Sequence, residues 1–338
     1  MKPISKRRPV EIVVCVHNSP EDVRRCLSSV RDTMSGNDSL LIIDDGSADE
    51  TRLLCERISA GASDKIRLIR RPAGTGFCKA ANAGLRETSS DIVILLNSDT
   101  IVSGDWIDRI AACMMANWQI GIVGPLSNAG GWQSIPKLPD GPLQSNPMRD
   151  DLQTLSAVYQ YCRGFRERFD YPIVEQINGF CMALSRPLLQ TVGLFDEERF
   201  PMGYGEENDL TFRAMDAGFL CSVAIDCFVY HAKTKSYTPA IREKYNLAGQ
   251  VQLHDLHGRE RVMQAVVSTQ NHPVLRIIRS EAETAFSENG WSDLAETPLQ
   301  PNHASEPELR PLRLDTRDPA PKRITPEWSA ARLSYDDI

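Results

Sequence analysis

The sequence predicts an α/β fold, in which helices flank a mostly parallel central sheet. Short runs of large aliphatic residues, such as residues 40–43 and 92–96, are typical of strands that are buried on both faces. Helical segments alternate with these runs along the first 125 residues, which is the pattern of βαβ units. Both runs stop abruptly at polar residues, at the strand ends where ligands of open α/β sheets bind.

The elements of the first 125 residues follow in regular order. We expect strands at residues 10–16, 39–43, 66–70, 92–96 and 120–123, and helices at 20–34, 49–60, 77–88 and 105–116. Ser19 is the expected N-cap of the first helix, and Asp49 begins the second helix, as the helix dipole favours.

The remaining residues are less regular. Gly, Pro, Ser and Asn dominate from residue 128 to 147, and long stretches of this kind are usually functional or mobile. Further elements are expected as a helix at 150–168, a strand at 180–185, helices at 186–192 and 208–217, a strand at 221–229 and weak helical periodicity over 241–267. We predict one domain over residues 1–270 and a C-terminal extension at 271–338 that is largely irregular or disordered, because its Pro-rich, polar composition buries little surface. The extension could join a further domain or an oligomer partner.

Composition excludes several classes of partner. A 338-residue chain with a formal net charge of −7 has no electrostatic reason to bind nucleic acid. No apolar run approaches the length that spans a bilayer, and the N-terminus has no apolar signal-peptide core. The nine cysteines have no CxxC spacing, which indicates buried, reduced thiols rather than a zinc site. We therefore expect a cytoplasmic protein without a transmembrane segment, able to act at the inner face of a membrane.

Acidic residues follow two of the predicted strands. Asp44 and Asp45 end the second strand, and Asn97-Ser98-Asp99 ends the fourth. Mutual repulsion makes such a cluster costly unless a cation or a hydrogen-bonding ligand binds there, and a nucleotide with a metal-bound diphosphate would suit. Asp-Gly-Ser is also good turn chemistry, so a turn with a helix cap is the alternative interpretation of Asp44 and Asp45.

Five segments in order over residues 10–262 resemble family 2 glycosyltransferases, which are inverting sugar-nucleotide transferases with a GT-A fold. The segments are Val14-Cys15-Val16-His17-Asn18, Ile43-Asp44-Asp45-Gly46-Ser47-Ala48-Asp49, Gly74-Thr75-Gly76-Phe77-Cys78-Lys79-Ala80-Ala81-Asn82-Ala83-Gly84, Asn97-Ser98-Asp99, and Gly203-Tyr204-Gly205-Glu206-Glu207-Asn208-Asp209-Leu210-Thr211-Phe212-Arg213. The third segment is not a Rossmann GxGxxG, because Lys79 stands at the third glycine position.

The resemblance implies a nucleotide-binding, Rossmann-like half at residues 9–125 and an acceptor half at 126–270. It implies a nucleoside diphosphate sugar as donor, linked to UDP, dTDP or GDP. The residues expected to bind this donor are His17, Asn18, Asp44, Asp45, Gly76, Lys79, Asn82, Asn97 and Ser98.

The resemblance also implies a divalent metal, Mn²⁺ or Mg²⁺. The family's Asp-x-Asp motif falls on Asn97-Ser98-Asp99, so Asp99 is the expected direct ligand, and His231 matches the later metal-binding histidine. The alternative for His231 is a histidine packed at a strand end.

The catalytic base implied by the resemblance is Glu207, with Glu206 as the fallback. An inverting transfer needs one carboxylate that removes the proton of the acceptor hydroxyl. Asp209 and Arg213 lie four residues apart near the start of the same predicted helix, and we expect them to form an ion pair.

Three residues are expected on the acceptor side: Trp132, Asn178 and Gly179. Trp132 could stack on a sugar ring or anchor the long loop. The acceptor could be a saccharide, a lipid-linked sugar or a protein, and the resemblance favours bacterial polysaccharide or glycoconjugate synthesis. His254 and His257 are spaced to chelate a metal, but solvated side chains are the favoured interpretation.

Two other functions compete with the transferase. A sugar-1-phosphate nucleotidyltransferase would need a Gly-rich, basic loop after the first strand, where this chain has His17-Asn18-Ser19-Pro20. A non-catalytic nucleotide-sugar-binding domain would lack the base, yet both glutamates and Asp99 are present.

Overall fold

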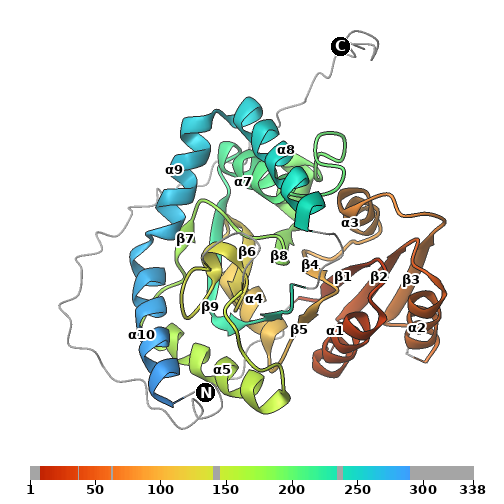
Figure 1. Cartoon of the computed structure of the whole chain (residues 1–338), viewed down its shortest axis with the longest axis horizontal. Helices are drawn as coiled ribbons and strands as arrows, with labels where there is room; N and C mark the ends of the chain where they lie inside the picture. The colour runs from red at the N-terminus through yellow and green to blue at the C-terminus, as the bar shows by residue number, and fades with distance from the viewer. Residues whose placement is uncertain (1–7, 37, 62–63, 140–144, 234–238, 290–338) are drawn as a thin grey trace. The chain divides into compact units, whose positions relative to one another are not determined.

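The computed structural model describes residues 8–36, 38–61, 64–139, 145–233 and 239–289. Strands from these residues form an eight-stranded sheet with the order β3-β2-β1-β4-β8-β6-β9-β7 (Figure 1). The strands are β1 Val10–Val16, β2 Ser39–Asp45, β3 Ile66–Arg71, β4 Ile92–Asn97, β6 Ile120–Leu126, β7 Ile173–Val174, β8 Cys181–Ser185 and β9 Leu220–Phe228. The described elements all belong to one unit, residues 1–300.

The sheet is mostly parallel in its N-terminal half, as predicted. Strand β1 pairs in parallel with both β2 and β4, and the register aligns Val16 with Asp44 and Cys15 with Asn97. The carboxyl ends of these three strands therefore meet at one edge of the sheet. Strand β8 differs, because it pairs antiparallel with both β4 and β6 and so joins the two halves of the sheet.

Helices cover both faces of the sheet (Figure 1). The structure has helices α1 Pro20–Thr33, α2 Asp49–Ala60, α3 Phe77–Arg86, α4 Trp106–Met115, α5 Leu152–Arg163, α6 Arg186–Val192, α7 Glu206–Asp216, α8 Pro239–His257, α9 Arg259–Gln270 and α10 Pro273–Asn289, with 3-10 turns η1 Gly131–Gln133 and η2 Gly164–Glu167. Helix α3 packs on β1 and β2, whereas α4 and α5 pack on β9. Ser19 is the N-cap residue of α1, as predicted, and its carbonyl accepts a hydrogen bond from the Val23 amide at 3.1 Å, but its side chain makes no cap hydrogen bond.

Three short strands were not predicted: β7 at the edge of the large sheet, and a pair outside that sheet. Strands β5 Thr100–Ile101 and β10 Tyr230–His231 form an antiparallel pair, in which His231 lies opposite Thr100. This pairing brings the segment after β4 beside the segment after β9, although they are far apart in the sequence. It fixes Asp99, which directly precedes β5, close to His231 of β10.

Helix α10 lies within the stretch for which we expected mostly irregular structure. Arg168 holds it through two hydrogen bonds of 2.7 Å to Glu281, and Tyr161 packs against Phe286 with ring centroids 5.7 Å apart. Its apolar side chains Val274, Leu275 and Ile278 are buried, which explains why it packs on the domain. The boundary at residue 270 stays a prediction, and the rest of the extension, from residue 290, lies outside the described residues.

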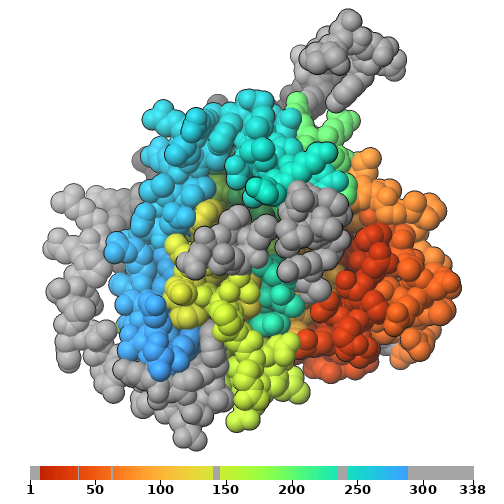
Figure 2. All heavy atoms as spheres, in the orientation of Figure 1, coloured from red at the N-terminus to blue at the C-terminus, as the bar shows by residue number. Residues whose placement is uncertain are grey.

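Helices α8, α9 and α10 form a continuous band on the face shown in Figure 2. Large apolar side chains are exposed on the first two of these helices, including Leu247, Val251, Met263 and Val267. None of the helices in the described residues is long and apolar enough to cross a membrane.

The nine cysteines all lie within the described residues and are free thiols. Eight are buried and Cys15 is partly buried, as predicted for reduced thiols. Burial raises the pKa of Cys26 and Cys221 to about 12, so these side chains are protonated and unreactive near neutral pH.

Candidate functional site

A cavity of about 1430 Å³ opens where β1, β2 and β4 end and extends along α7, α8 and α9. Most of the predicted site residues line it: His17, Asp45, Gly76, Asn97, Ser98, Asp99, Trp132, Asn178, Gly179, Glu206, Glu207 and His231. The fold thus brings together the proposed nucleotide, metal, catalytic and acceptor residues. The other four predicted residues, which are Asn18, Asp44, Lys79 and Asn82, are not among the described residues that line the cavity.

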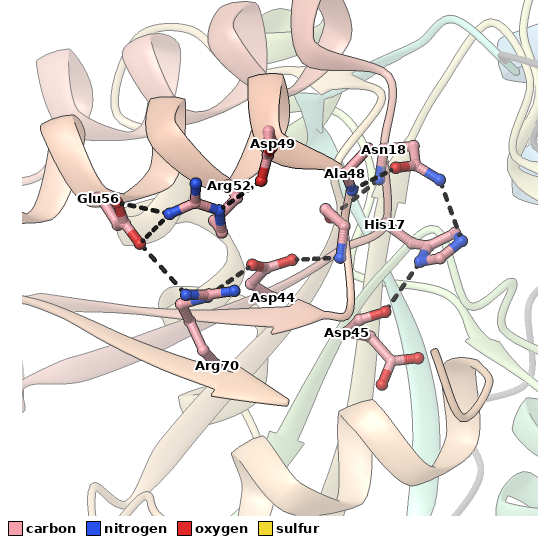
Figure 3. Close-up of polar contacts among 10 residues, drawn as sticks. His17, Asn18, Asp44, Asp45, Ala48, Asp49, Arg52, Glu56 and Arg70 are labelled. Carbon is pink, nitrogen blue, oxygen red and sulfur yellow. Dashed lines mark hydrogen bonds and ion pairs between the residues drawn. The ribbon is translucent and has the colours of Figure 1, made fainter. Parts of the chain in front are cut away.

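The two carboxylates at the end of β2 point in different directions (Figure 3). Asp44 is fully buried, accepts a hydrogen bond from the Ser47 amide at 3.0 Å and pairs with Arg70 at 3.4 Å. Asp45 faces the cavity, and its carboxylate accepts hydrogen bonds from the amides of Thr75 and Gly76 at 2.8 and 3.0 Å. The turn interpretation therefore accounts for Asp44, whereas Asp45 positions the loop between β3 and α3.

Of the other three residues outside the lining, two make structural contacts and the third is exposed. Asn18 accepts a hydrogen bond from the Ala48 amide at 2.9 Å, which joins the loops after β1 and β2 (Figure 3). Asn82 is buried and donates to the Phe195 carbonyl at 2.9 Å, and Lys79 is exposed on α3. Because of these positions, none of the three residues enters the function proposed below.

The Gly74–Thr75–Gly76 loop packs against the loop before α7. Gly76 has φ +94°, and a Cβ atom there would lie 2.3 Å from the Pro201 carbonyl oxygen. A residue with a side chain would therefore be strained by its backbone conformation and would also collide with backbone. The close approach joins the nucleotide side of the cavity to the segment that carries the two glutamates.

Gly76→Ala is expected to reduce both stability and donor binding. We expect a loss of about 3 kcal/mol in the free energy of unfolding, from the positive φ and the contact with Pro201 together. Gly36→Ala is the matched control, because Gly36 also has a positive φ (+54°) but would meet nothing within 4 Å, and should cost about 1 kcal/mol. Urea unfolding of both variants measures the difference, and equal losses would contradict the packing argument.

Asp99 and His231 meet at the centre of the cavity wall. Asp99 Oδ1 lies 3.3 Å from His231 Nε2, and the Ala232 amide donates to the Asp99 carbonyl at 2.9 Å. His231 Nδ1 lies 3.1 Å from the Ala129 carbonyl, so this nitrogen carries the proton and Nε2 presents a lone pair when the ring is neutral. Two lone-pair donors that face each other are stabilised by a proton or a cation between them, so this pair fits a metal.

Asn128 holds the backbone of His231 and was not predicted as a site residue. Its side chain accepts from the His231 amide at 2.8 Å and donates to the His231 carbonyl at 3.0 Å. The ring of Phe180 stacks on the His231 imidazole with centroids 5.2 Å apart. No periodicity or motif in the sequence signals this role, because the contact joins residues that are far apart in the chain.

Metal ligation by this pair would need further ligands besides the His, Cys, Asp and Glu side chains of the described residues. No group of three or more His, Cys, Asp or Glu side chains that could hold a metal occurs among the described residues. A carboxylate oxygen and an imidazole nitrogen suit Mn²⁺ or Mg²⁺ when phosphate oxygens and water complete the shell.

Glu206 and Glu207 begin α7 and differ in exposure. Glu206 is 6% exposed, whereas Glu207 is partly exposed to the cavity. Burial raises the pKa of both carboxyls, and the neighbouring Glu207 charge raises the pKa of Glu206 further, well above its usual value. Their mutual hydrogen bond favours a protonated Glu206 beside an ionised Glu207. Glu207 is therefore the better placed of the two to accept a proton.

The three predicted acceptor-side residues line the cavity, and one of them, Gly179, contacts Glu207. The Gly179 amide donates a hydrogen bond to the Glu207 carboxylate, and a Cβ atom at Gly179 would lie 3.4 Å from the Glu207 Cβ atom. The backbone amide of Asn178 donates a hydrogen bond to Gln133 Oε1 at 2.7 Å. Trp132 lines the cavity, and its carbonyl accepts a hydrogen bond from Arg279 of α10 at 3.1 Å.

The expectation of a solvated His257 is wrong. Its imidazole Nε2 lies 2.9 Å from Asp209 Oδ1, and the other Asp209 oxygen accepts from Arg213 at 2.8 Å. The predicted Asp209–Arg213 ion pair is present, and His257 extends it from α8 to the helix that carries Glu207. His254, by contrast, lines the cavity.

The proteins of similar sequence described here are named as glycosyltransferases. Residues 11–174 match the model of the family "Glycosyl transferase family 2". An N-acetylglucosaminyltransferase of Mesorhizobium japonicum is 24% identical over 70% of this chain and 54% of its own length. Another, from Sinorhizobium fredii, is 24% identical over 62% of this chain and 48% of its own length, so the chain spans about half of these relatives.

Solved glycosyltransferases share the fold. A mannosyltransferase from Pyrobaculum calidifontis in complex with GDP-Man and Mn²⁺ superposes with a TM-score of 0.55, at 15% identity over 84% of this chain and 76% of its own. GalNAc-T7 with UDP, GalNAc and Mn²⁺ gives a TM-score of 0.56, at 15% identity over 86% of this chain and 53% of its own. Residues 11–174 of this chain thus match glycosyl transferase family 2, and the described residues have the GT-A fold of these solved glycosyltransferases.

Proposed function

We propose that the chain is an inverting, metal-dependent transferase that moves a sugar from a nucleoside diphosphate to a hydroxyl acceptor. The observation that carries this proposal is a single cavity whose wall contains Asp99, His231 and Glu207. The wall also contains the ends of the three parallel strands, where nucleotides bind in open α/β sheets.

The nucleotide end of the donor is proposed to lie against the ends of β1, β2 and β4. His17 follows β1 and Asp45 ends β2. Asn97 ends β4, and Ser98 follows it. His17 Nδ1 lies 2.8 Å from the Asp45 carbonyl, so this part of the wall is already ordered (Figure 3). A rigid wall of this kind binds its ligand with little loss of side-chain freedom.

Asp99 and His231 are proposed to hold a divalent cation, Mn²⁺ or Mg²⁺, together with the donor's phosphates. Both solved structures described above contain Mn²⁺, which supports a divalent metal here. Bound at this position, the cation would neutralise the charge that develops on the departing nucleoside diphosphate.

Glu207 is proposed to remove the proton of the acceptor hydroxyl. As the acceptor oxygen forms its bond to the anomeric carbon, the bond from that carbon to the diphosphate oxygen breaks, and the configuration inverts. The proton moves to the Glu207 carboxylate, which the Gly179 and Gly205 amides hold in place. Glu206 is proposed to stay protonated and to orient Glu207.

The curated relatives suggest which donor to test first. Those described above are named N-acetylglucosaminyltransferases, so we propose UDP-N-acetylglucosamine, with an acceptor used in bacterial polysaccharide or glycoconjugate synthesis. The test is a panel of this donor, UDP-galactose, dTDP-glucose and GDP-mannose, each with and without Mn²⁺. We expect one donor to raise the melting temperature and to be hydrolysed slowly in an Mn²⁺-dependent manner, and a lack of response to every donor would count against the proposal.

The pH dependence of kcat/KM is expected to show an acid limb above the ordinary glutamate range. Burial raises the pKa of Glu207, so this group becomes a base only at a higher pH than an exposed glutamate would. Activity should therefore rise with pH through the raised pKa. The free energy of unfolding should fall over the same range, because the native state then binds more protons than the unfolded state.

Rate profiles and urea unfolding at matched pH values measure both trends. The acid limb should disappear in Glu207→Gln, whose residual rate should not depend on this group. An acid limb at the ordinary glutamate pKa in the wild type would contradict the proposed environment of the base.

A further inference from the structure

Gln176 places an unpaired polar group in the wall of the cavity. The residue follows β7, is 1% exposed and lines the cavity. Its Oε1 accepts a hydrogen bond from the Asn208 side chain, whereas its Nε2 has no partner among the described residues. A buried polar group of this kind destabilises the protein unless a ligand supplies the missing bond.

The backbone around Gln176 is held on both sides. The Glu175 amide donates to Thr269 Oγ1 of α9 at 3.2 Å, and the Asn178 amide donates to Gln133 Oε1 at 2.7 Å. The next residue, Ile177, is fully buried. The unpaired group is therefore fixed in position before a ligand arrives, which is the usual arrangement of a specificity-determining contact.

The position of the Gln176–Asn208 pair relates it to the acceptor. Asn208 directly follows Glu207 on α7, and Gln176 lies in the segment that leads to Gly179, whose amide contacts Glu207. The proposed nucleotide contacts come from other elements, namely the ends of β1, β2 and β4. The amide pair thus belongs to the base side of the cavity.

We propose that the Gln176–Asn208 pair is an acceptor subsite for a saccharide. The unpaired amide atom of Gln176 would bond a hydroxyl or N-acetyl oxygen of the acceptor sugar, close to the hydroxyl that Glu207 deprotonates. The inference rests on the proposed function, because it presumes that Glu207 is the base. It adds the acceptor class, a role for Asn208 of the fifth motif segment, and Gln176, which no motif in the sequence identifies.

Gln176→Met tests the subsite, because methionine has a similar volume and cannot replace the hydrogen bond. Three quantities are measured: hydrolysis of UDP-N-acetylglucosamine with water as acceptor, transfer to a panel of p-nitrophenyl monosaccharides, and the melting temperature. We expect kcat/KM for the saccharide to fall by about ten- to a hundredfold, mainly through KM, with hydrolysis unchanged. The melting temperature should change little, because the substitution removes the unpaired buried group together with the hydrogen bond from the partly exposed Asn208 side chain.

The matched control is Gln160→Met, which replaces an exposed glutamine on α5 and should change none of the three quantities. An unchanged KM for each saccharide that the wild type uses, or an equal loss of hydrolysis and transfer, would overturn the subsite. If the wild type turns over no donor or saccharide, the proposed function fails. The melting temperature of Gln176→Met then tests whether the amide pair has a structural role. A clear fall in the melting temperature of Gln176→Met would then show that the amide pair is a structural support, which also overturns the inference.

Discussion

Glu207→Gln is expected to lower kcat by about a hundredfold to ten-thousandfold while leaving donor affinity nearly unchanged. Glutamine keeps the shape of the side chain and one oxygen that can accept from the Gly179 or Gly205 amide, but it cannot accept the proton of the acceptor hydroxyl. Steady-state kinetics with the best donor of the panel measures kcat, and calorimetry measures donor affinity. A loss confined to donor affinity would place Glu207 in binding rather than in proton transfer.

Glu206→Gln is the matched control for this prediction. Burial and the neighbouring charge hold Glu206 in its protonated form, and a glutamine side chain resembles a neutral carboxylic acid. The variant should therefore keep activity within about tenfold of the wild type, since its orienting hydrogen bond survives in part. If Glu206→Gln loses more activity than Glu207→Gln, the two glutamates have been assigned in the wrong order.

The first half of the fold could be predicted because its signals are local. Strand β1 and helix α2 begin and end at the predicted residues, because an apolar run marks the strand and acidic residues mark the start of the helix. The polar ends of β2 and β4 meet because parallel strands align their carboxyl ends. The neighbouring strands β5 and β10 could not be predicted. Two residues per strand carry no periodicity, and the pairing depends on contacts between distant segments.

The different directions of Asp44 and Asp45 follow from strand geometry. Successive side chains on a strand point to opposite faces, so Asp44 and Asp45 could not both face the crevice. The structure assigns the cavity side to Asp45, while Asp44 pairs with Arg70 on the other side. Local geometry was sufficient to predict one carboxylate in the cavity, although it could not say which one.

Errors arise from packing that the sequence does not encode locally. His257 contacts Asp209 because α8 packs on α7. Helical spacing alone does not show which helix is the packing neighbour. Gln176 carries no signal for the same reason, since its placement depends on Thr269 and Gln133 at distant positions. The motif residues of the site were predictable, whereas the residues that hold them were not.

Asp99→Ala is expected to abolish the metal-dependent part of activity, with a loss of about a thousandfold or more in kcat/KM. The substitution removes the carboxylate that faces His231 Nε2, so a cation would keep one protein ligand instead of two. Binding of Mn²⁺ in the presence of UDP, measured by calorimetry, should weaken strongly. Asp91→Asn is the control, because it removes a carboxylate at the opposite end of β4, far from the strand end that lines the cavity.

The proposed Asp99–His231 metal site also predicts how substitutions of these two residues combine. If Asp99 and His231 hold the same cation, either single substitution already removes it, so Asp99→Ala with His231→Ala should lose little more activity than the worse single variant. Losses that multiply, together with unchanged Mn²⁺ binding in His231→Ala, would mean that the histidine acts apart from the metal. His231 would then be a strand-end residue packed under Phe180, and Asp99 would need a different partner for the cation.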